Sequence, residues 1–546
     1  MRICWKIAGW LGALALAAAC GGSPPDGDEP LIGLFEDLGS HRRPITTDSE
    51  LAQRYFDQGL NLSYAFNHDT AVSSFEEAAR LDPDCAICFW GMALALGPNI
   101  NAPMGPEAGI RAHAAAQRAQ ALAPAAREVE RDLIAAVALR YSADPEADRA
   151  SLDRIYAEAM REVQRRHPDD LDVATLTAEA LMDLSPWDYW TGDAEPRAQT
   201  PQVLALLEGV MERDPQHPGA NHYYIHAVEE FFPERAVPAA ERLVGIAPDA
   251  GHLVHMPSHI FWRVGRYEEA LEINQRAAAA DEAFFGWCRA AGLYRIVYYP
   301  HNIHFLWAAA VAEGRSDLAL SSARNLASKV PDSMIEEFAG AEEWRAIPLF
   351  TMARFGHWDA IRGEPQPAPA HRYTTGAWHY ARGLASVRQA RLDEAATELA
   401  ALQAIAESEA LASLDFVGEP AADYLRIGAH HLAGELAAAR GEVDAAVAEL
   451  EQAVRIQDAQ IYTEPPRWYF PLRQALGAVL LDAGRAEQAE AVYRLDLAQH
   501  PRNGWSLYGL ARSLREQGRD PEAAAIETGF TNAWERADIK LAASRF

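Results

Sequence analysis

At 546 residues the chain is too long for one hydrophobic core, so several domains or an extended array of repeats are expected. Hydrophobic residues make up 49% of it, which excludes a largely disordered protein. The formal net charge of −29, together with the lack of a Lys/Arg-rich stretch, argues against nucleic-acid binding, because a phosphate backbone would be repelled.

The first twenty residues have the features of a secretory signal. Arg2 and Lys6 form a short basic region, and the apolar stretch 7–19 that follows is too short to span a bilayer. The run LAAAC, which ends at Cys20, resembles a bacterial lipoprotein signal, in which the cysteine becomes the acylated first residue. A plain signal peptide cleaved near Cys20 is the alternative. We predict a lipoprotein-type signal over 1–20, a lipid anchor at Cys20, and an extracytoplasmic location, on the periplasmic side or at the cell surface of a bacterial membrane.

The next segment, 21–46, is rich in Gly, Ser, Pro and Asp. Such a composition is typical of flexible linkers, so we predict a tether between the lipid anchor and the folded body. No later run reaches the ~18 apolar residues that a membrane helix needs.

The body of the chain contains a helical repeat. In FDQGLNLSYAFNHDTAVSSFEEAARLDPDC (56–85), small residues, an aromatic and a proline occur at the offsets of a tetratricopeptide (TPR) unit, which is a pair of antiparallel helices. The pattern returns in GRYEEALEINQRA (265–277), GEVDAAVAELEQA (441–453) and GRAEQAEAVYRLDLAQHP (484–501). We predict an all-α superhelix of the TPR type. The Pro-rich segment 363–371 predicts a boundary between an N-terminal array over 47–362 and a C-terminal array over 363–546.

Three histidines fall within eight residues of the segment GHLVHMPSHIFWRVGRYEEA (251–270). The landmarks Gly265 and Ala270 put them at positions 2, 5 and 9 of a repeat, on one stripe of its first helix. This helix lines the concave surface of a TPR superhelix. Histidines occupy the same rows, or lie within one residue of them, in the units before and after, over 217–310. We therefore predict that rings from three successive helices converge in the groove.

Converging imidazoles point to a metal site, because neutral imidazole is the commonest metal ligand in proteins. We expect a divalent transition metal (Zn, Fe or Cu) rather than Ca²⁺ or Mg²⁺, which prefer oxygen ligands. One unit earlier, Glu179 would add a carboxylate. The predicted ligands, in order of preference, are His255, His259, His226, His222, His304, His301, His252 and Glu179. Structural hydrogen-bond ladders of histidines and peptide recognition remain open as alternatives.

Two aromatic segments lie near these units in the sequence. The insertion DEAFFGWCRAAGLYRIVYYPHN (281–302) lengthens the central unit, and it would form either a lid over the groove or additional aromatic core. The segment SPWDYW (185–190) would either wall the same cavity or pack in the core.

A pair of cysteines, Cys85 and Cys88, begins another predicted repeat helix. No histidine follows the second cysteine, so c-type haem attachment is not expected. A disulfide or redox pair, a soft-metal pair, or two small buried residues remain open for this motif. No Gly-rich phosphate-binding loop is present, so no nucleotide cofactor is expected.

The segments NHYYIHAVE, HLVHMPSHIF, PHNIHFLWAAA and EPPRWYFPLRQALG together resemble a group of large bacterial TPR lipoproteins without an established activity. The resemblance runs from about Ala52 to the last repeats, and it implies the fold and a site in the groove but no reaction. TPR scaffolds generally bind protein or peptide partners in the concave groove, often through Lys and Asn, whereas these rows hold His. Three functions stay open: a membrane-tethered scaffold with a metal site, a metal-dependent enzyme, and a plain interaction scaffold without metal.

Overall fold

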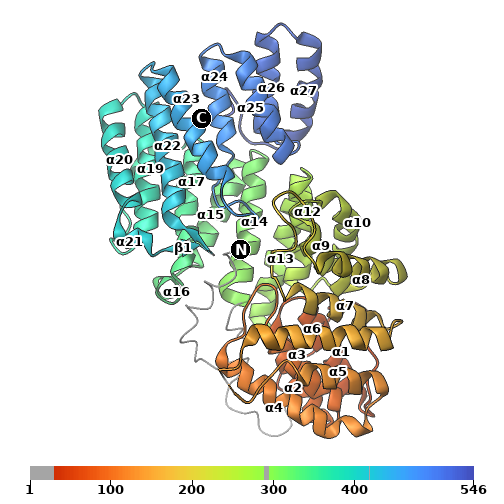
Figure 1. Cartoon of the computed structure of the whole chain (residues 1–546). Helices are drawn as coiled ribbons and strands as arrows, with labels where there is room; N and C mark the ends of the chain where they lie inside the picture. The colour runs from red at the N-terminus through yellow and green to blue at the C-terminus, as the bar shows by residue number, and fades with distance from the viewer. Residues whose placement is uncertain (1–29, 145, 288–293, 417) are drawn as a thin grey trace. The chain divides into compact units, whose positions relative to one another are not determined.

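The computed structural model of the chain describes residues 30–144, 146–287, 294–416 and 418–546 (Figure 1). Within these ranges the regular secondary structure is helical apart from two isolated β-bridges and one hairpin of two short strands, β1 (Asp415–Phe416) and β2 (Glu419–Pro420). None of the helices described combines the length and apolar character needed to cross a membrane. The chain forms two compact units, one comprising residues up to Ile260 with Arg276–Tyr299, the other Phe261–Gln275 with Pro300–Phe546.

The first unit is built from helices α1 to α11 and parts of α12 and α13. They are α1 (Glu50–Tyr64), α2 (His68–Leu81), α3 (Ala86–Ala95), α4 (Pro106–Leu122), α5 (Glu128–Ala138), α6 (Arg149–Arg166), α7 (Leu171–Met182), α8 (Thr200–Arg213), α9 (Pro218–Val228), α10 (Pro233–Leu243), α11 (Gly251–His255), α12 (Pro257–Arg263) and α13 (Tyr267–Trp287). Short turns of 3₁₀ helix (Ala123–Ala125) and π helix (Tyr294–Tyr298) complete it.

The second unit contains the remaining helices. They are α14 (Tyr299–Ala312), α15 (Ser316–Ser328), α16 (Asp332–Glu337), α17 (Glu342–Arg354), α18 (Trp358–Gly363), α19 (Arg372–Arg388), α20 (Leu392–Ala406), α21 (Glu409–Ala412), α22 (Ala421–Ala439), α23 (Val443–Asp458), α24 (Leu472–Asp482), α25 (Ala486–Gln499), α26 (Gly504–Glu516) and α27 (Asp520–Ala533), with a 3₁₀ turn at Ala339–Ala341.

In both units an aromatic ring lies between glycines of two successive first helices. Phe75 of α2 contacts Gly59 of α1 and Gly91 of α3 so closely that a Cβ on either glycine would lie under 3 Å from its ring. In the second unit Tyr493 of α25 lies in the same way between Gly477 and Gly509. The absent Cβ atoms let the helices approach, and the ring fills the space between them. The predicted all-α, TPR-type architecture is confirmed.

The predicted boundary at 363 is not a division in the structure. Helix α18, which ends at Gly363, packs against α19 on the other side of the Pro-rich segment. The indole N–H of Trp378 donates a hydrogen bond back to the carbonyl oxygen of Glu364. The segment is a loop within the second unit. The two units divide instead within the His-rich stretch, where α12 and α13 contribute residues to both.

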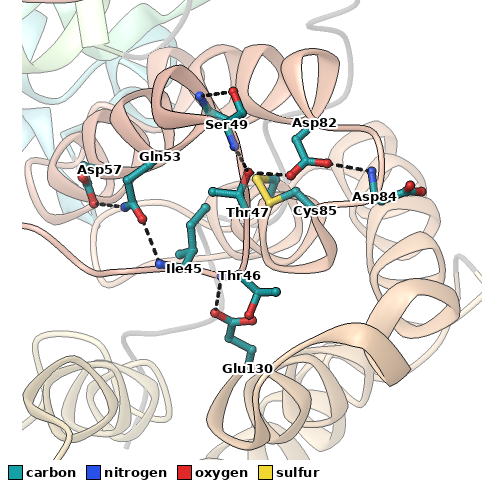
Figure 2. Close-up of a disulfide and its surroundings, with 12 residues drawn as sticks. Ile45, Thr46, Thr47, Ser49, Gln53, Asp57, Asp82, Asp84, Cys85 and Glu130 are labelled. Carbon is teal, nitrogen blue, oxygen red and sulfur yellow. Dashed lines mark hydrogen bonds between the residues drawn. A yellow bond between two sulfur atoms is a disulfide. The ribbon is translucent and has the colours of Figure 1, made fainter.

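The predicted flexible tether is wrong for residues 30–46, while 21–29 lie outside the described residues. The amides of Phe35, Ile45 and Thr46 donate to side chains of Gln58, Gln53 and Glu130 respectively. Figure 2 shows the last two contacts beside the start of α1. A flexible linker would leave these amides to water, so residues 30–46 are a structural part of the first unit.

Candidate metal centre

Five histidines of the first unit lie close together in its interior. Helix α9 supplies His222 and His226 one turn apart, α11 supplies His252 and His255, and α12 supplies His259. Pro257 separates α11 from α12, because proline has no amide hydrogen with which to continue a helix. Each of the five residues is at most 5% exposed.

The prediction that these rings line an open groove is therefore wrong. Helix α1 packs against α9, and Phe66, just beyond the end of α1, covers the imidazoles. Its ring centroid lies 4.5 Å from that of His222 and 5.3 Å from that of His252. Tyr298, at the end of the π-helical turn, contacts His252, and the centroids of the two rings are 4.8 Å apart. The rings are thus enclosed by aromatic side chains.

Three of the five imidazoles form one group of converging ligand atoms. His222, His226 and His252 each offer one ring nitrogen, and these atoms all lie within 4.8 Å of one another. The Nε2 atoms of His222 and His252 are 3.2 Å apart. Two nitrogens bound to one tetrahedral Zn²⁺ at 2.0–2.1 Å would be separated by about 3.4 Å. Only small movements are needed to place an ion between them.

Hydrogen bonds at the opposite ring edges determine which nitrogens carry lone pairs. His222 donates from Nδ1 to the carbonyl oxygen of Tyr64, 2.6 Å away, so its Nε2 is an acceptor. His226 donates from Nδ1 to Glu229 Oε1 at 3.3 Å, which leaves its Nε2 with a lone pair and no hydrogen-bond partner. His252 Nδ1 is also without a partner. An unpaired buried polar atom is costly, and an ion bound to His226 Nε2 would satisfy that atom.

The three rings are held in the neutral form that metal binding requires. Burial lowers the pKa of His252 well below its ordinary value, and the neighbouring imidazoles lower it further. Burial, together with His226, does the same to His222. For His226 burial again lowers the pKa, although Glu229 opposes the effect. No proton has to be displaced from an imidazolium at neutral pH.

Glu229, a residue that was not predicted, connects the three rings to the other two histidines. Its Oε2 lies 3.0 Å from His259 Nδ1, while its Oε1 accepts from His226. Burial acts to raise the pKa of Glu229, but the imidazoles of His259 and His226 outweigh burial and hold it below its ordinary value. His255 and His259 approach each other with their Nε2 atoms 2.9 Å apart. The sequence signal for Glu229 was its place three residues after His226.

The remaining predicted ligands, Glu179, His301 and His304, do not belong to the group formed by His222, His226 and His252. Glu179 is buried beside Asp183, whose carboxylate pairs with Arg140 at 2.5 Å, and Glu179 belongs to none of the groups of converging ligand atoms. Burial raises the pKa of Glu179, although Arg140 opposes the effect. His301 and His304 are residues of the second unit. There His304 stacks on Trp307 with centroids 5.2 Å apart, and burial together with Arg467 lowers its pKa to about 3.

A second group of possible ligands, His41, Asp172 and His217, is better explained as structural. Asp172 Oδ1 lies 2.9 Å from His41 Nε2 and 3.3 Å from His217 Nε2, and it also accepts from Tyr64. Its other oxygen accepts from Arg43 at 3.1 Å. A guanidinium already neutralises this carboxylate and would repel a metal cation. The group fastens residues 41–43 to α7.

The two aromatic segments, 185–190 and 281–302, both contribute side chains near the histidines. Trp187 lies edge-on to His226, with centroids 5.0 Å apart, while the residue itself is 41% exposed. Trp190 packs in the core and donates from its indole to the carbonyl oxygen of Ala227. In the insertion, Tyr294 is buried and its hydroxyl accepts from the amide of His252. Of the insertion's described residues, Tyr294 and Tyr298 therefore form aromatic core beside the histidines.

Cys85 and Cys88 form a disulfide at the start of α3 (Figure 2). Both residues are fully buried. Sulfur atoms joined in this way have no thiolate to offer a metal, so the soft-metal alternative does not apply to this oxidised form. Cys20 lies outside the described residues.

This chain shares little sequence with known proteins. No family model matches the sequence, and no curated protein matches it. Solved structures with a similar arrangement include the APC/C hetero-tetramer Cut9-Hcn1, at 13% identity over 89% of this chain and 76% of that chain, with a TM-score of 0.29. The human IFIT1 dimer with m7Gppp-AAAA matches at 12% identity over 90% of this chain and 91% of that chain, with a TM-score of 0.32. Such low scores transfer no function.

Proposed function

We propose that the first unit of this helical-repeat protein binds one transition-metal ion through His222, His226 and His252. The observation that carries the proposal is the convergence of three neutral, buried ring nitrogens within 4.8 Å. Nitrogen ligands favour Zn²⁺, Fe²⁺ or Cu²⁺ over Ca²⁺ and Mg²⁺. Glu229 would act on the ion indirectly, because a carboxylate that accepts from a ligating imidazole fixes the orientation of the ring and raises its basicity.

Metal content of protein purified without a histidine tag tests the proposal. We expect about one equivalent of one transition metal in the wild-type protein and a loss of most of it in the variant H226Q. The variant H68Q is a matched control, because His68 also stacks on Phe66 but belongs to none of the groups of converging ligand atoms. Wild-type protein without stoichiometric metal, even after incubation with Zn²⁺, would reject the site. Equal metal content in wild type and H226Q would reject this ligand set.

The number of ligands bears on a second candidate, a metal-dependent enzyme. Three protein nitrogens leave one position of a tetrahedral ion for water, as in catalytic zinc sites, whereas structural sites are closed by four protein ligands. Trp187 would control access to that position, because it covers His226 and is partly exposed. Azide binding to Co²⁺-substituted protein, followed by visible absorption, tests this candidate. A spectrum that does not change with azide would contradict an exchangeable position.

We further propose that the protein is anchored to the extracytoplasmic face of a bacterial membrane through an acylated Cys20. The signal-like sequence supports this location, and the disulfide between Cys85 and Cys88 fits an oxidising compartment. Fractionation of cells that express the wild type and the variant C20S tests the anchor. We expect the wild type in the membrane fraction and C20S outside it. Equal membrane association of both would contradict lipidation at Cys20. A protein or peptide partner stays a prediction.

A further inference from the structure

The second unit contains an aromatic pocket that is separate from the histidine site. Side chains of α12, α14, α17, α23, α24 and α26 and of the loop before α24 line it. Its empty volume is about 480 Å³, including the open mouth. The walls are mostly apolar and include the aromatic residues Trp262, Trp307, Trp468, Tyr469, Phe470 and Trp505. Apolar walls with a few polar groups are typical of binding sites for small organic molecules.

A buried guanidinium without a counterion lines this pocket. Arg354 is only 4% exposed, and its guanidinium carbon lies 3.5 Å from the ring centroid of Trp505 and 4.5 Å from that of Phe470. It donates to the side-chain oxygen of Gln474 and, at 3.5 Å, to the carbonyl oxygen of Ser544. Throughout the described residues, no carboxylate lies within ion-pair distance of Arg354, and its Nε has no partner.

The carboxylate whose charge acts on Arg354, that of Asp496, is already engaged by other groups. Asp496 accepts hydrogen bonds from Ser506 and, at 3.3 Å, from Gln474, and it pairs with His500 at 3.1 Å. Gln474 therefore stands between this carboxylate and Arg354. Burial lowers the pKa of Arg354, and Tyr469 and Asp496 compensate only in part. A cation in this position is costly unless an anion joins it.

A second unpaired donor lines the same pocket. The indole nitrogen of Trp468, a residue only 3% exposed, has no hydrogen-bond partner. Two other indoles of the walls are satisfied: Trp307 donates to Thr351 Oγ1 at 2.7 Å and Trp505 to the carbonyl oxygen of Val311 at 3.0 Å. Arginine and tryptophan side chains are donors only. The missing partner must therefore be an acceptor.

We propose that this pocket binds a small organic acid, with its carboxylate at Arg354 and Trp468 and an aromatic or branched apolar body against the surrounding rings. A carboxylate has the acceptor sites to take a hydrogen bond from each of the two donors, and it supplies the missing negative charge. An inorganic anion would leave the aromatic walls without a partner. The walls thus favour an acid with an apolar body.

Titration of the full-length protein with phenylacetate, followed by tryptophan fluorescence and calorimetry, tests the proposal. Phenylacetamide and phenethylamine have nearly the same shape without the negative charge. We expect saturable binding of phenylacetate, at least ten-fold weaker binding of the amide, and no binding of the amine, because hydrogen bonds to charged groups are about twice as strong as neutral ones. Equal affinity for acid and amide, or no saturable binding of either, would overturn the proposal. Sulfate binding as tightly as phenylacetate would overturn the role of the apolar walls.

Two tryptophan variants remain informative even if replacement of Arg354 prevents folding. The variant W468F removes the unpaired donor and keeps a ring, and we expect phenylacetate to bind about five-fold more weakly. The matched control W307F also makes one wall ring smaller, but it removes an indole N–H that already has a partner, so we expect a smaller loss of affinity than in W468F, with a lowered melting temperature. In R354Q, if folded, affinity should fall roughly 10- to 100-fold. Equal effects of W468F and W307F on affinity would contradict the proposed contact.

Discussion

The variant E229Q is the sharpest test of the carboxylate at the histidine site. Glu229 is 1% exposed, accepts from His226 Nδ1 at 3.3 Å, and lies 3.0 Å from His259 Nδ1. Glutamine has nearly the same volume, but it offers one acceptor atom in place of two and carries no charge. One imidazole therefore loses its acceptor and meets an amide group instead.

The expected magnitude follows from the charged contact that is lost. A hydrogen bond to a charged group contributes about 1.5–3 kcal/mol, and removal of a carboxylate behind a metal-bound histidine costs about 10- to 100-fold in metal affinity. We expect a loss of this size when E229Q and wild type compete with a chromogenic chelator for Zn²⁺. The matched control is E179Q, a buried glutamate of the same unit that belongs to none of the groups of converging ligand atoms. Unchanged affinity in E229Q, or an equal loss in E179Q, would refute the assigned role of Glu229.

Three further predictions concern stability. The variant D172N leaves the buried Arg43 without one of its carboxylates. It should therefore lower the free energy of unfolding by about 3–5 kcal/mol and expose 30–46 to limited proteolysis. A proteolysis pattern like that of wild type would contradict the role of Asp172 in holding this segment to α7. The variant G91A should lower the free energy of unfolding, measured in urea, by about 1–3 kcal/mol, because its Cβ would lie 2.5 Å from the Phe75 ring. In the control G209A in α8 the new Cβ meets no atom within 4 Å, so this variant should not be destabilised. Equal stability of the two variants would refute the packing argument. Burial, reinforced by Glu268 and opposed by Arg315, raises the pKa of Glu313 from 4.5 to about 7, so its stabilising contribution is complete below pH 4.5 and is lost as the pH rises through 7. Between pH 4.5 and pH 8 the free energy of unfolding should therefore fall by up to about 3 kcal/mol less in E313Q than in wild type. Identical pH profiles of the two proteins would contradict this assignment.

Local sequence patterns predicted the helical repeats because the small and aromatic positions that define them are local. Phe75 and Gly59 are sixteen residues apart, and their contact follows from one helical hairpin. The same periodicity put His222, His226 and His252 in matching rows, and the structure brings them together. Contacts within a hairpin or between neighbouring hairpins could thus be predicted from the sequence.

Contacts between distant segments were not predictable in this way. The groove expected around the histidines is filled because α1 packs on α9, and His222 donates to Tyr64, 158 positions earlier in the chain. Residues 30–46 looked like a linker by composition, yet Arg43 pairs with Asp170 far along the chain. Glu179 was predicted as a ligand and Glu229 was not considered for a related reason: helical register placed Asp183 one turn from Glu179, but it gave no sign that the distant Arg140 would act on both carboxylates.

X-ray absorption of the purified protein, at the edge of the metal that elemental analysis identifies, reports the ligands of the bound ion. We expect about three imidazole nitrogens bound directly to the metal, at 2.0–2.1 Å if it is zinc, and the loss of this imidazole signature in the variant H226Q. A shell dominated by carboxylate oxygen, or an unchanged imidazole signature in H226Q, would contradict a site built from His222, His226 and His252.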